Sequence, residues 1–266
     1  GVPKGLPCIT HPLAPKNAVP GAPAWDDIVA KTAPMSDSPV RPADELCTIM
    51  YTSGTTGMPK GVMHSFGTLA WNLGAGLKRV PLDNSTRMLS YLPLAHSFER
   101  SWVEAQSLVD GRTQLFFAES LETFLQDLQR ARPTLFISVP RLWLKFQQGV
   151  FAKMPPAKLD RLLGLPIIGR LVARKVLKGL GLDAVIQAGS GSAPLPPDLI
   201  RWYRRLGLRL FEGYGMSEDN SYSHSSNERF SEPGYVGVAM PGVQVRLSPE
   251  GEILINGTPA ELGSPK

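Results

Sequence analysis

Short apolar runs alternate with stretches of helical periodicity between residues 46 and 211. Apolar runs bounded by turn residues are typical of buried strands, whereas apolar residues that recur every three to four positions are typical of helices packed on one face. Strands that alternate with helices predict an α/β fold with a mostly parallel sheet flanked by helices. The expected strands are 46–52, 87–91, 114–117, 135–139, 184–188 and 208–211. The expected helices are 68–77, 98–109, 121–128 and 198–206, with a further helix that opens at Pro140.

The helix expected at 121–128 has the clearest periodicity. Its apolar residues fall at i, i+3, i+4 and i+7, and Ser120 stands in the N-cap position. Pro133 disfavours helical backbone at Arg132, so we expect the helix to end there. The four apolar residues are Leu121, Phe124, Leu125 and Leu128.

Both ends of the chain depart from this central pattern. The first 42 residues hold nine prolines, which block long helices and central strands, and they predict an extended connection with one short helix near 25–29. After residue 235, apolar segments at 243–247 and 252–255 flank a turn and predict a hairpin. The expected parts are a proline-rich connecting segment (1–45), an α/β subdomain (46–234) and the truncated start of a β-rich subdomain (235–266).

Composition narrows the class of protein only slightly. Hydrophobic residues make up 42% of the chain and charged residues 19%, as in ordinary globular proteins. The net charge of +5 suits a polyanionic ligand, but it also suits nucleic acid or an acidic membrane surface. No apolar stretch approaches the ~20 residues of a membrane-spanning helix. Cys8 and Cys47 lie in no CxxC or Cys/His cluster, so we expect a reducing, cytoplasmic setting.

A polar, glycine-rich segment follows the first expected strand: Tyr51-Thr-Ser-Gly-Thr-Thr-Gly-Met-Pro-Lys-Gly61. Its backbone N–H and side-chain O–H donors can surround an anion, and Lys60 adds a compact positive charge. A Walker A loop is excluded, because that pattern requires glycine immediately before the lysine and Pro59 stands there. The alternative is a polar turn with an exposed lysine, which the strong bias of the whole segment makes a poor explanation.

Two further loops with glycine follow expected strands: Gly189-Ser-Gly-Ser-Ala-Pro194 and Gly213-Tyr-Gly-Met-Ser-Glu218. With segment 51–61, they resemble the signatures of the adenylate-forming (AMP-binding) superfamily, which includes acyl-CoA ligases, luciferases and the adenylation domains of peptide synthetases. The resemblance runs from about residue 40 to the C-terminus, through a turn at 237–241 and a strand at 251–257. It implies a fragment of an acyl-CoA synthetase-like N-terminal domain.

The same resemblance implies that the protein uses ATP and Mg²⁺ to join a carboxylic acid to AMP, with coenzyme A as co-substrate. Tyr214 would stack on adenine, and Thr52 and Glu218 would bind Mg²⁺, an ion that prefers hard oxygen ligands. Taken singly, Glu218 would be a solvated carboxylate and Tyr214 an ordinary loop aromatic. The catalytic residues implied are Thr52, Lys60, His96 and Glu218. The ATP-binding residues implied are Thr52, Ser53, Gly54, Thr55, Thr56, Gly57, Lys60, Gly191, Ser192, Ala193, Glu212, Gly213, Tyr214, Gly215, Met216 and Ser217.

The segment Tyr91-Leu-Pro-Leu-Ala-His-Ser-Phe-Glu-Arg100 bears on the acid substrate. It resembles the long-chain fatty acid–CoA ligase form of a third family motif, in which His96 borders the carboxylate and α-phosphate and Phe98 and Arg100 lie towards the acyl entrance. The alternative is a helix N-terminus with a satisfied histidine and a surface Glu99–Arg100 pair. His64 is expected to be structural or to line the site in a general way.

A basic amphipathic pattern occupies residues 162–178, inside a looser insertion that begins near residue 155. It is compatible with peripheral contact with an anionic membrane, on the inner face if the protein is cytoplasmic. A solvated basic face packed on the main domain is the alternative.

Several functional alternatives stay open on the sequence. They are an aryl-acid ligase, an adenylating enzyme that serves a carrier protein, and a non-catalytic nucleotide-binding module. Nucleic acid is not an expected partner, because no stacking stripe or known binding motif supports it. The resemblance also implies that a C-terminal domain with a catalytic lysine lies beyond Lys266 and that part of the acyl pocket precedes Gly1, so that the chain alone is expected to be inactive.

Overall fold

The computed structural model describes residues 5–11, 19–52, 58–80 and 82–256, and the chain divides into two compact units, 1–41 and 42–266. The first unit contains helix α1 (Trp25–Lys31), which confirms the short helix expected near 25–29. Thr10 forms an isolated parallel bridge with Ala24, and its carbonyl oxygen accepts a 2.8 Å hydrogen bond from the backbone N–H of Trp25. The expected division at 45/46 and 234/235 stays a prediction.

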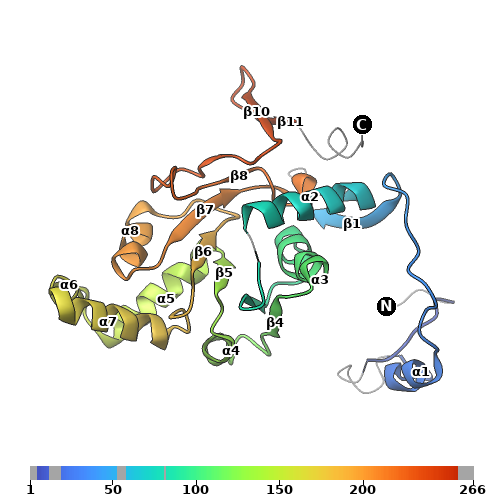
Figure 1. The fold of residues 1–266 in the computed structure, drawn as a ribbon, viewed down its shortest axis with the longest axis horizontal. Helices are drawn as coiled ribbons and strands as arrows, with labels where there is room; N and C mark the ends of the chain where they lie inside the picture. The colour runs from blue at the N-terminus through green and yellow to red at the C-terminus, as the bar shows by residue number, and fades with distance from the viewer. Residues whose placement is uncertain (1–4, 12–18, 53–57, 81, 257–266) are drawn as a thin grey trace. The chain divides into compact units, whose positions relative to one another are not determined.

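The second unit alternates strands and helices along the chain, as Figure 1 shows. Its helices are α2 (Phe66–Arg79), η1 (Glu99–Ala105), α3 (Gln106–Asp110), α4 (Phe124–Ala131), α5 (Pro140–Lys153), α6 (Pro156–Leu163), α7 (Pro166–Gly179), α8 (Pro197–Arg205) and η2 (Ser217–Asp219). Its strands are β1 (Leu46–Thr52), β2 (Lys60–Ser65), β3 (Arg87–Ser90), β4 (Gln114–Phe117), β5 (Leu135–Ser138), β6 (Gln187–Ser190), β7 (Leu210–Tyr214), β8 (His224–Ser225), β9 (Val238–Ala239), β10 (Gln244–Leu247) and β11 (Ile253–Asn256). In the described parts of the chain, no helix combines the length and hydropathy that crossing a bilayer requires.

Parallel strands form the centre of the second unit, and the α/β fold class is confirmed. Strands β5, β6 and β7 pair in parallel, as do β3 and β4. The backbone N–H of Thr134 donates to the carbonyl oxygen of Arg87 at 3.0 Å and so joins the starts of β3 and β5. Strands β8 and β9 extend the β7 edge in antiparallel order, and the connections that lead to them contain no α-helix. The five-stranded sheet β5–β9 is therefore mixed. Its parallel pairs, and the β3–β4 pair, are those for which the sequence predicts a helix between the two strands.

Trp143 lies at the centre of the main hydrophobic core. It is fully buried on α5, in edge contact with Phe136 of β5 and Tyr203 of α8. Its indole N–H donates to the carbonyl oxygen of Gly189, and its own carbonyl oxygen accepts the Tyr203 hydroxyl at 2.7 Å. The core thus packs against the end of β6, where the loop of residues 189–192 begins.

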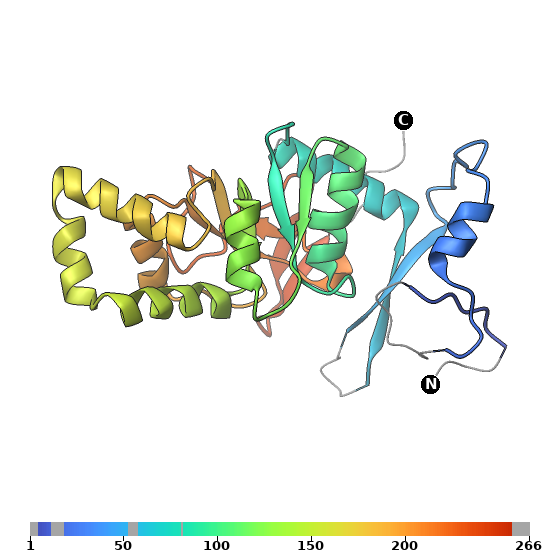
Figure 2. The same ribbon diagram turned by 90° about the horizontal axis from the view of Figure 1, so that it is seen from below.

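Several element boundaries differ from expectation. Helix α4 begins at Phe124 rather than 121, because the Ser120 hydroxyl accepts the backbone N–H groups of Glu122 and Thr123 and holds a turn there. Leu121 is consequently 88% exposed. Strand β6 begins at residue 187 instead of 184, and the insertion expected to be loose contains the ordered helices α6 and α7 (Figure 2).

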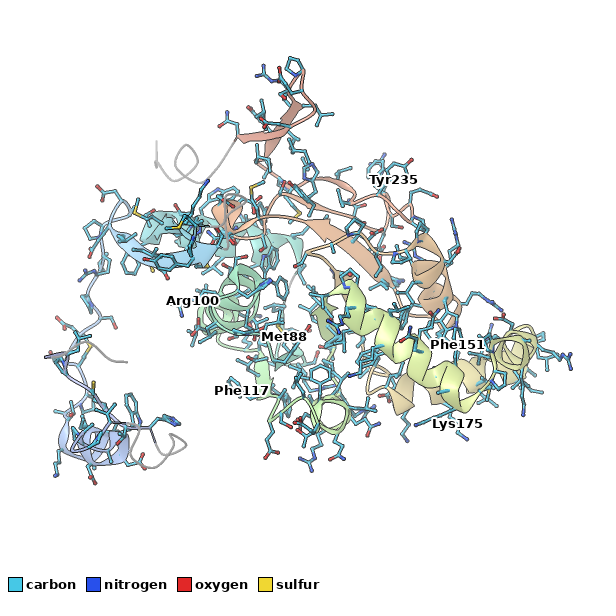
Figure 3. The ribbon with its side chains drawn as sticks, turned by 180° about the vertical axis from the view of Figure 1, so that it is seen from behind. Met88, Arg100, Phe117, Phe151, Lys175 and Tyr235 are labelled. Carbon is cyan, nitrogen blue, oxygen red and sulfur yellow. The ribbon has the colours of Figure 1, made fainter. Side chains whose placement is uncertain are left out.

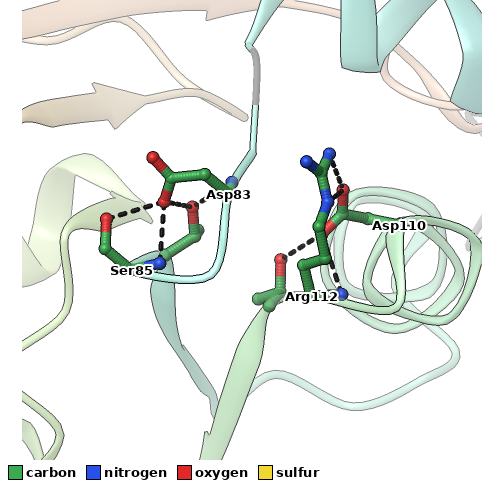
Figure 4. Close-up of polar contacts among 6 residues, drawn as sticks. Asp83, Ser85, Asp110 and Arg112 are labelled. Carbon is green, nitrogen blue, oxygen red and sulfur yellow. Dashed lines mark hydrogen bonds and ion pairs between the residues drawn. The ribbon is translucent and has the colours of Figure 1, made fainter.

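Two aspartates organise the turns that lead into the β3–β4 pair (Figure 4). The Asp83 carboxylate accepts the backbone N–H and the hydroxyl of Ser85, at 2.8 and 2.6 Å. The Asp110 carboxylate accepts the backbone N–H of Arg112 at 3.1 Å and forms an ion pair with its guanidinium. These local hydrogen bonds hold the turns that precede β3 and β4, and so they fix where each of the two strands starts.

Candidate functional site

A cleft of about 120 Å³ opens at the carboxyl ends of β5, β6 and β7. Such ends are where ligands bind in parallel sheets, because the loops that leave the strands converge there. The polar side of the cleft includes the loops after β6 and β7, and its apolar side includes Leu92, Phe98, Trp102, Ile137 and Met240. Polar loops on one side and aromatic and aliphatic side chains on the other can hold a ligand with both a charged and an apolar part.

The loop after β6 brings backbone close to the floor of the cleft. Gly191 borders the next strand, and a Cβ there would stand 3.4 Å from the carbonyl oxygen of Gly213, an ordinary contact distance. Ser192 has a positive φ of 69°. Of the residues predicted in this loop, Gly191 and Ser192 line the cleft, whereas Ala193 is exposed and does not.

The end of β7 contributes the second part of the polar side. Gly213, Tyr214 and Gly215 line the cleft, and the Tyr214 ring meets His224 edge-on with 5.8 Å between ring centroids. The Glu212 carboxylate is buried and accepts the backbone N–H groups of Leu195 and Gly234, at 3.4 and 3.0 Å. This carboxylate therefore ties two loops together, and its predicted part in ATP binding stays a prediction.

The residues that follow Tyr214 are fixed by a buried polar network. The His64 Nε2–H donates to the carbonyl oxygen of Ser217 at 2.8 Å, while His64 Nδ1 accepts the Asn220 amide at 3.2 Å. Asn220 also accepts the Ser101 hydroxyl, and its carbonyl oxygen accepts the indole N–H of Trp102. Burial lowers the pKa of His64 despite the opposing field of Glu218. Met216 and Ser217 thus belong to an anchored loop on which Glu218 is exposed.

His96 lines the cleft in a defined protonation state. Its Nδ1 accepts the backbone N–H of Phe98 at 3.2 Å, and burial lowers the pKa of the half-buried ring. The neutral ring therefore carries its proton on Nε2, so that His96 is a hydrogen-bond donor in the cleft. The alternative of a surface Glu99–Arg100 pair is wrong, because Glu99 is 1% exposed and Arg100 pairs with Glu104 at 3.0 Å. Figure 3 shows Arg100 on η1, and it does not line the cleft.

The predicted phosphate-binding loop is placed only at its two ends. Thr52 and Lys60 face each other across the antiparallel β1–β2 hairpin, and Lys60 is exposed. Neither lines the cleft. The predicted ATP-binding residues Ser53, Gly54, Thr55, Thr56 and Gly57 lie outside the described residues.

The predicted Mg²⁺ ligands offer the right donor atoms. Thr52 supplies a hydroxyl and Glu218 a carboxylate, and Mg²⁺ is usually bound through one or two protein oxygens together with phosphates and water. Over the described ranges, no three His, Cys, Asp or Glu side chains gather into a metal-binding group. A hydroxyl and a carboxylate are donors that suit an ion carried by a nucleotide, so the predicted pair stays a prediction.

Several polar and aromatic residues of the cleft were not expected from the sequence, among them Arg79, Trp102 and His224. Arg79, at the end of α2, lines it and donates to the carbonyl oxygen of Ser226 at 3.1 Å. Trp102 comes from η1, and His224 comes from β8, where its Nδ1 lies 2.7 Å from the Ser223 hydroxyl and burial lowers its pKa. None stands in a motif, and only the polar run around His224 was a local signal.

The family description AMP-binding enzyme matches residues 8–263 of the chain. The chain is 32% identical over 260 residues to long chain acyl-CoA synthetase 6, peroxisomal, of Arabidopsis thaliana, and the match covers 85% of this chain and 37% of that protein. It is 32% identical over 210 residues to long-chain-fatty-acid–CoA ligase ACSBG2 of Xenopus laevis, over 66% of this chain and 28% of that protein. The chain therefore spans about a third of the length of the curated relatives it matches.

Solved structures share the fold. ATP-bound MatB from Rhodopseudomonas palustris is 27% identical, with a TM-score of 0.65 over 88% of this chain and 44% of that chain. O-succinylbenzoate coenzyme A synthetase from Bacillus subtilis, in complex with ATP and magnesium ion, is 22% identical, with a TM-score of 0.64 over 88% of this chain and 46% of that chain. The second likeness bears on the fold alone. With the family match across nearly its whole length, the chain belongs to the AMP-binding enzyme family.

Proposed function

We propose that this chain is the nucleotide- and acid-binding part of an ATP-dependent long-chain fatty acid–CoA ligase. The observation that carries the proposal is the cleft itself, where the loops of Gly191 and Tyr214 and the donor His96 stand opposite apolar side chains. The relatives named long-chain acyl-CoA synthetases support the choice of acid.

ATP would lie along the polar side of the cleft. Tyr214 would stack on adenine, and the close-set backbone of Gly191 and Ser192 would leave room for the base. Thr52 and Lys60, with the hydroxyl residues between them in the sequence, would hold the β- and γ-phosphates. Mg²⁺, when bound by Thr52 and Glu218, would neutralise charge on the phosphate oxygens.

The fatty acid would enter from the apolar side. Phe98 and Trp102 stack with ring centroids 6.5 Å apart, and an acyl chain can pack against them and against Leu92. The Nε2–H of His96 would donate to the carboxylate or to an α-phosphate oxygen.

The first half-reaction, formation of the acyl-adenylate, depends on positioning of the reactants and needs no covalent intermediate with the protein. A carboxylate oxygen attacks the α-phosphorus, the bond from that phosphorus to the bridging oxygen breaks, and pyrophosphate leaves with the electron pair. The coenzyme A thiol then attacks the acyl carbonyl carbon, AMP leaves, and the thiol proton passes to solvent or a base. In such displacements the gain comes from alignment and from charge stabilisation by fixed donors.

Acid-dependent ATP–pyrophosphate exchange tests the proposal, measured on the longest protein that contains this chain. Exchange that peaks with long-chain fatty acids and is lost in Glu218→Gln supports it. Exchange with aryl acids only would keep adenylation and reject the acid, and no exchange with any acid would favour a non-catalytic nucleotide-binding module. We expect the 266-residue chain alone to bind MgATP weakly and not to turn over.

The aromatic stack gives one alternative a structural basis. Trp102 also stacks on Tyr222, with ring centroids 6.1 Å apart, and such a surface suits an aryl acid as well as an acyl chain. Delivery of the acyl group to a carrier-protein thiol remains the other variant of the same chemistry. A cytoplasmic location belongs to the same proposal.

A further inference from the structure

The outer face of α7 exposes aliphatic side chains that the fold does not use. Gly169 and Ala173 are buried against the core, whereas Ile167, Ile168 and Leu171 are 76%, 48% and 62% exposed. Helices α6 and α7 lie at one end of the second unit, beyond α5 (Figures 1 and 2). Such a cluster of exposed aliphatic residues on one ordered helix is typical of an interaction surface.

The same helix pair carries a strong excess of positive charge. Asp160 is its sole carboxylate, and that group pairs with Arg205 of α8 at 2.7 Å. The nearby Asp183 pairs with Arg132 at 2.8 Å. Within the described residues, the cations of α7 therefore have no carboxylate partner. The basic residues of α6 and α7 are Lys158, Arg161, Arg170, Arg174, Lys175 and Lys178.

A hollow of about 500 Å³ adjoins this face, between α7 and the end of α8. Arg170, Arg174 and Arg205 line it together with apolar residues that include Leu165 and Leu206, and its one carboxylate among the described residues, Asp183, is paired with Arg132. Arginine binds phosphate through paired N–H donors, and apolar residues beside the guanidinium groups of Arg170 and Arg174, unpaired within the described chain, suit an amphiphilic anion. Lys175, labelled in Figure 3, extends the positive charge along the helix.

We propose that the outer face of α7 docks on an anionic lipid bilayer. Ile167, Ile168 and Leu171 enter the headgroup region, while Arg170 and Arg174 hold a lipid phosphate at the hollow. Helix α7 carries no aromatic residue on which bases could stack, and this argues against nucleic acid as the partner. This docking surface rests on the proposed function. Long-chain fatty acids partition into bilayers, so a ligase docked there would meet its acid substrate.

Vesicle flotation of the full chain tests the docking. The wild type is expected to bind vesicles of phosphatidylcholine and phosphatidylglycerol, to leave vesicles of phosphatidylcholine alone unbound, and to be released by salt. Arg170→Glu with Arg174→Glu is expected to weaken binding about thirtyfold or more, at about 1 kcal/mol per basic residue near such a surface. Ile167→Ser with Leu171→Ser is expected to weaken it about tenfold or more through lost apolar burial.

Helix α5 provides a matched control. It also has 14 residues and a proline at its start, and Arg141 and Lys145 share the i, i+4 spacing of Arg170 and Arg174. Arg141→Glu with Lys145→Glu should leave vesicle binding unchanged. Equal binding by the two charge-reversed variants would overturn the proposal, and so would wild-type binding to RNA or polyglutamate but not to vesicles.

The thermal melt of each variant separates docking from folding. The nucleotide site lies elsewhere, so binding of MgATP by the docking variants should match the wild type. If the longest protein that contains this chain shows no ATP–pyrophosphate exchange but vesicle binding is intact, the proposed enzyme is rejected and the docking surface stands. If exchange is present and vesicle binding is absent, the docking surface is rejected and the proposed enzyme stands.

Discussion

His64 and Ser217 lie 153 residues apart in the chain and are joined by a 2.8 Å hydrogen bond from the His64 Nε2–H to the Ser217 carbonyl oxygen. The bond couples the β1–β2 hairpin, which carries Thr52 and Lys60, to the loop that carries Glu218. His64 is 2% exposed and does not line the cleft, so its role is structural. The two loops proposed to meet the phosphates and Mg²⁺ thus share one buried anchor.

Removal of the His64 ring should destabilise the protein. His64→Ala leaves the Ser217 carbonyl and the Asn220 amide without their partner and should lower the free energy of unfolding by about 2–3 kcal/mol. His64→Gln keeps a donor near the Nε2 position and should recover part of the loss. Urea denaturation measures both, with Lys60→Ala on the exposed end of the same strand as control. Equal midpoints for His64→Ala and wild type would show that the anchor contributes nothing.

The same residue should give stability a defined pH dependence. Burial lowers the pKa of His64 in the folded protein below its ordinary value of 6.5, so the unfolded chain takes up the proton first. The His64 contribution is therefore complete above pH 6.5 and declines as pH falls through the lowered pKa, by at most about 1.4 kcal/mol per pH unit. The difference in unfolding free energy between wild type and His64→Gln, followed from pH 8 to pH 5, isolates this slope. A constant difference over that range would contradict it.

Glu99 offers a test of a buried carboxylate beside the cleft. Burial raises its pKa, and its two oxygens accept the Ser90 hydroxyl at 2.5 Å and the Leu92 backbone N–H at 3.4 Å. Glu99→Gln keeps the shape and one strong acceptor, so it should cost about 1 kcal/mol or less at neutral pH. Glu99→Ala loses both acceptors and opens a cavity, and should cost about 2–3 kcal/mol. Thermal unfolding at pH 7 measures both, and a Glu99→Gln variant destabilised as much as Glu99→Ala would mean that the charge itself stabilises the fold.

The sequence predicts elements whose signals are local. Strands β1 and β4 have the expected bounds, because each is an apolar run that ends in polar or turn residues. The helix expected at 98–109 is less regular, since it begins as the π-helix η1. A π-helical turn adds a residue that periodicity does not reveal.

The sequence predicts the cleft residues that belong to glycine motifs. It does not predict those that long-range contacts bring to the cleft. Gly191 and Tyr214 stand in motifs and line the cleft as expected. Arg79 and Trp102 reach the cleft only because α2 and η1 pack beside the loop of Asn220. No local pattern encodes that packing, because each residue reads as an ordinary helical position.

Tyr214 should contribute to nucleotide affinity through its ring. Stacking of a base on an aromatic ring is worth about 1–3 kcal/mol, so Tyr214→Ala should weaken MgATP binding roughly five- to hundredfold, while Tyr214→Phe should bind almost normally. Tyr235→Ala, at a residue 68% exposed and outside the cleft, is the control (Figure 3). Calorimetric titration with MgATP decides, and equal affinities for Tyr214→Ala and the control would remove the ring from the adenine site.

Two glycines of the cleft should respond differently to the same added methyl group. At Gly191 a Cβ would meet the Gly213 carbonyl oxygen at 3.4 Å, an ordinary contact, and the methyl would stand in the cleft. At Gly215 a Cβ would lie 2.5 Å from the Ser221 Cα, so the backbone of one loop would have to move. Gly191→Ala should therefore keep the thermal stability of the wild type and weaken MgATP binding, whereas Gly215→Ala should lower stability by about 1–3 kcal/mol. Thermal melts paired with MgATP titrations separate the two effects. Unchanged MgATP affinity in a stable Gly191→Ala would mean that the nucleotide does not approach this backbone.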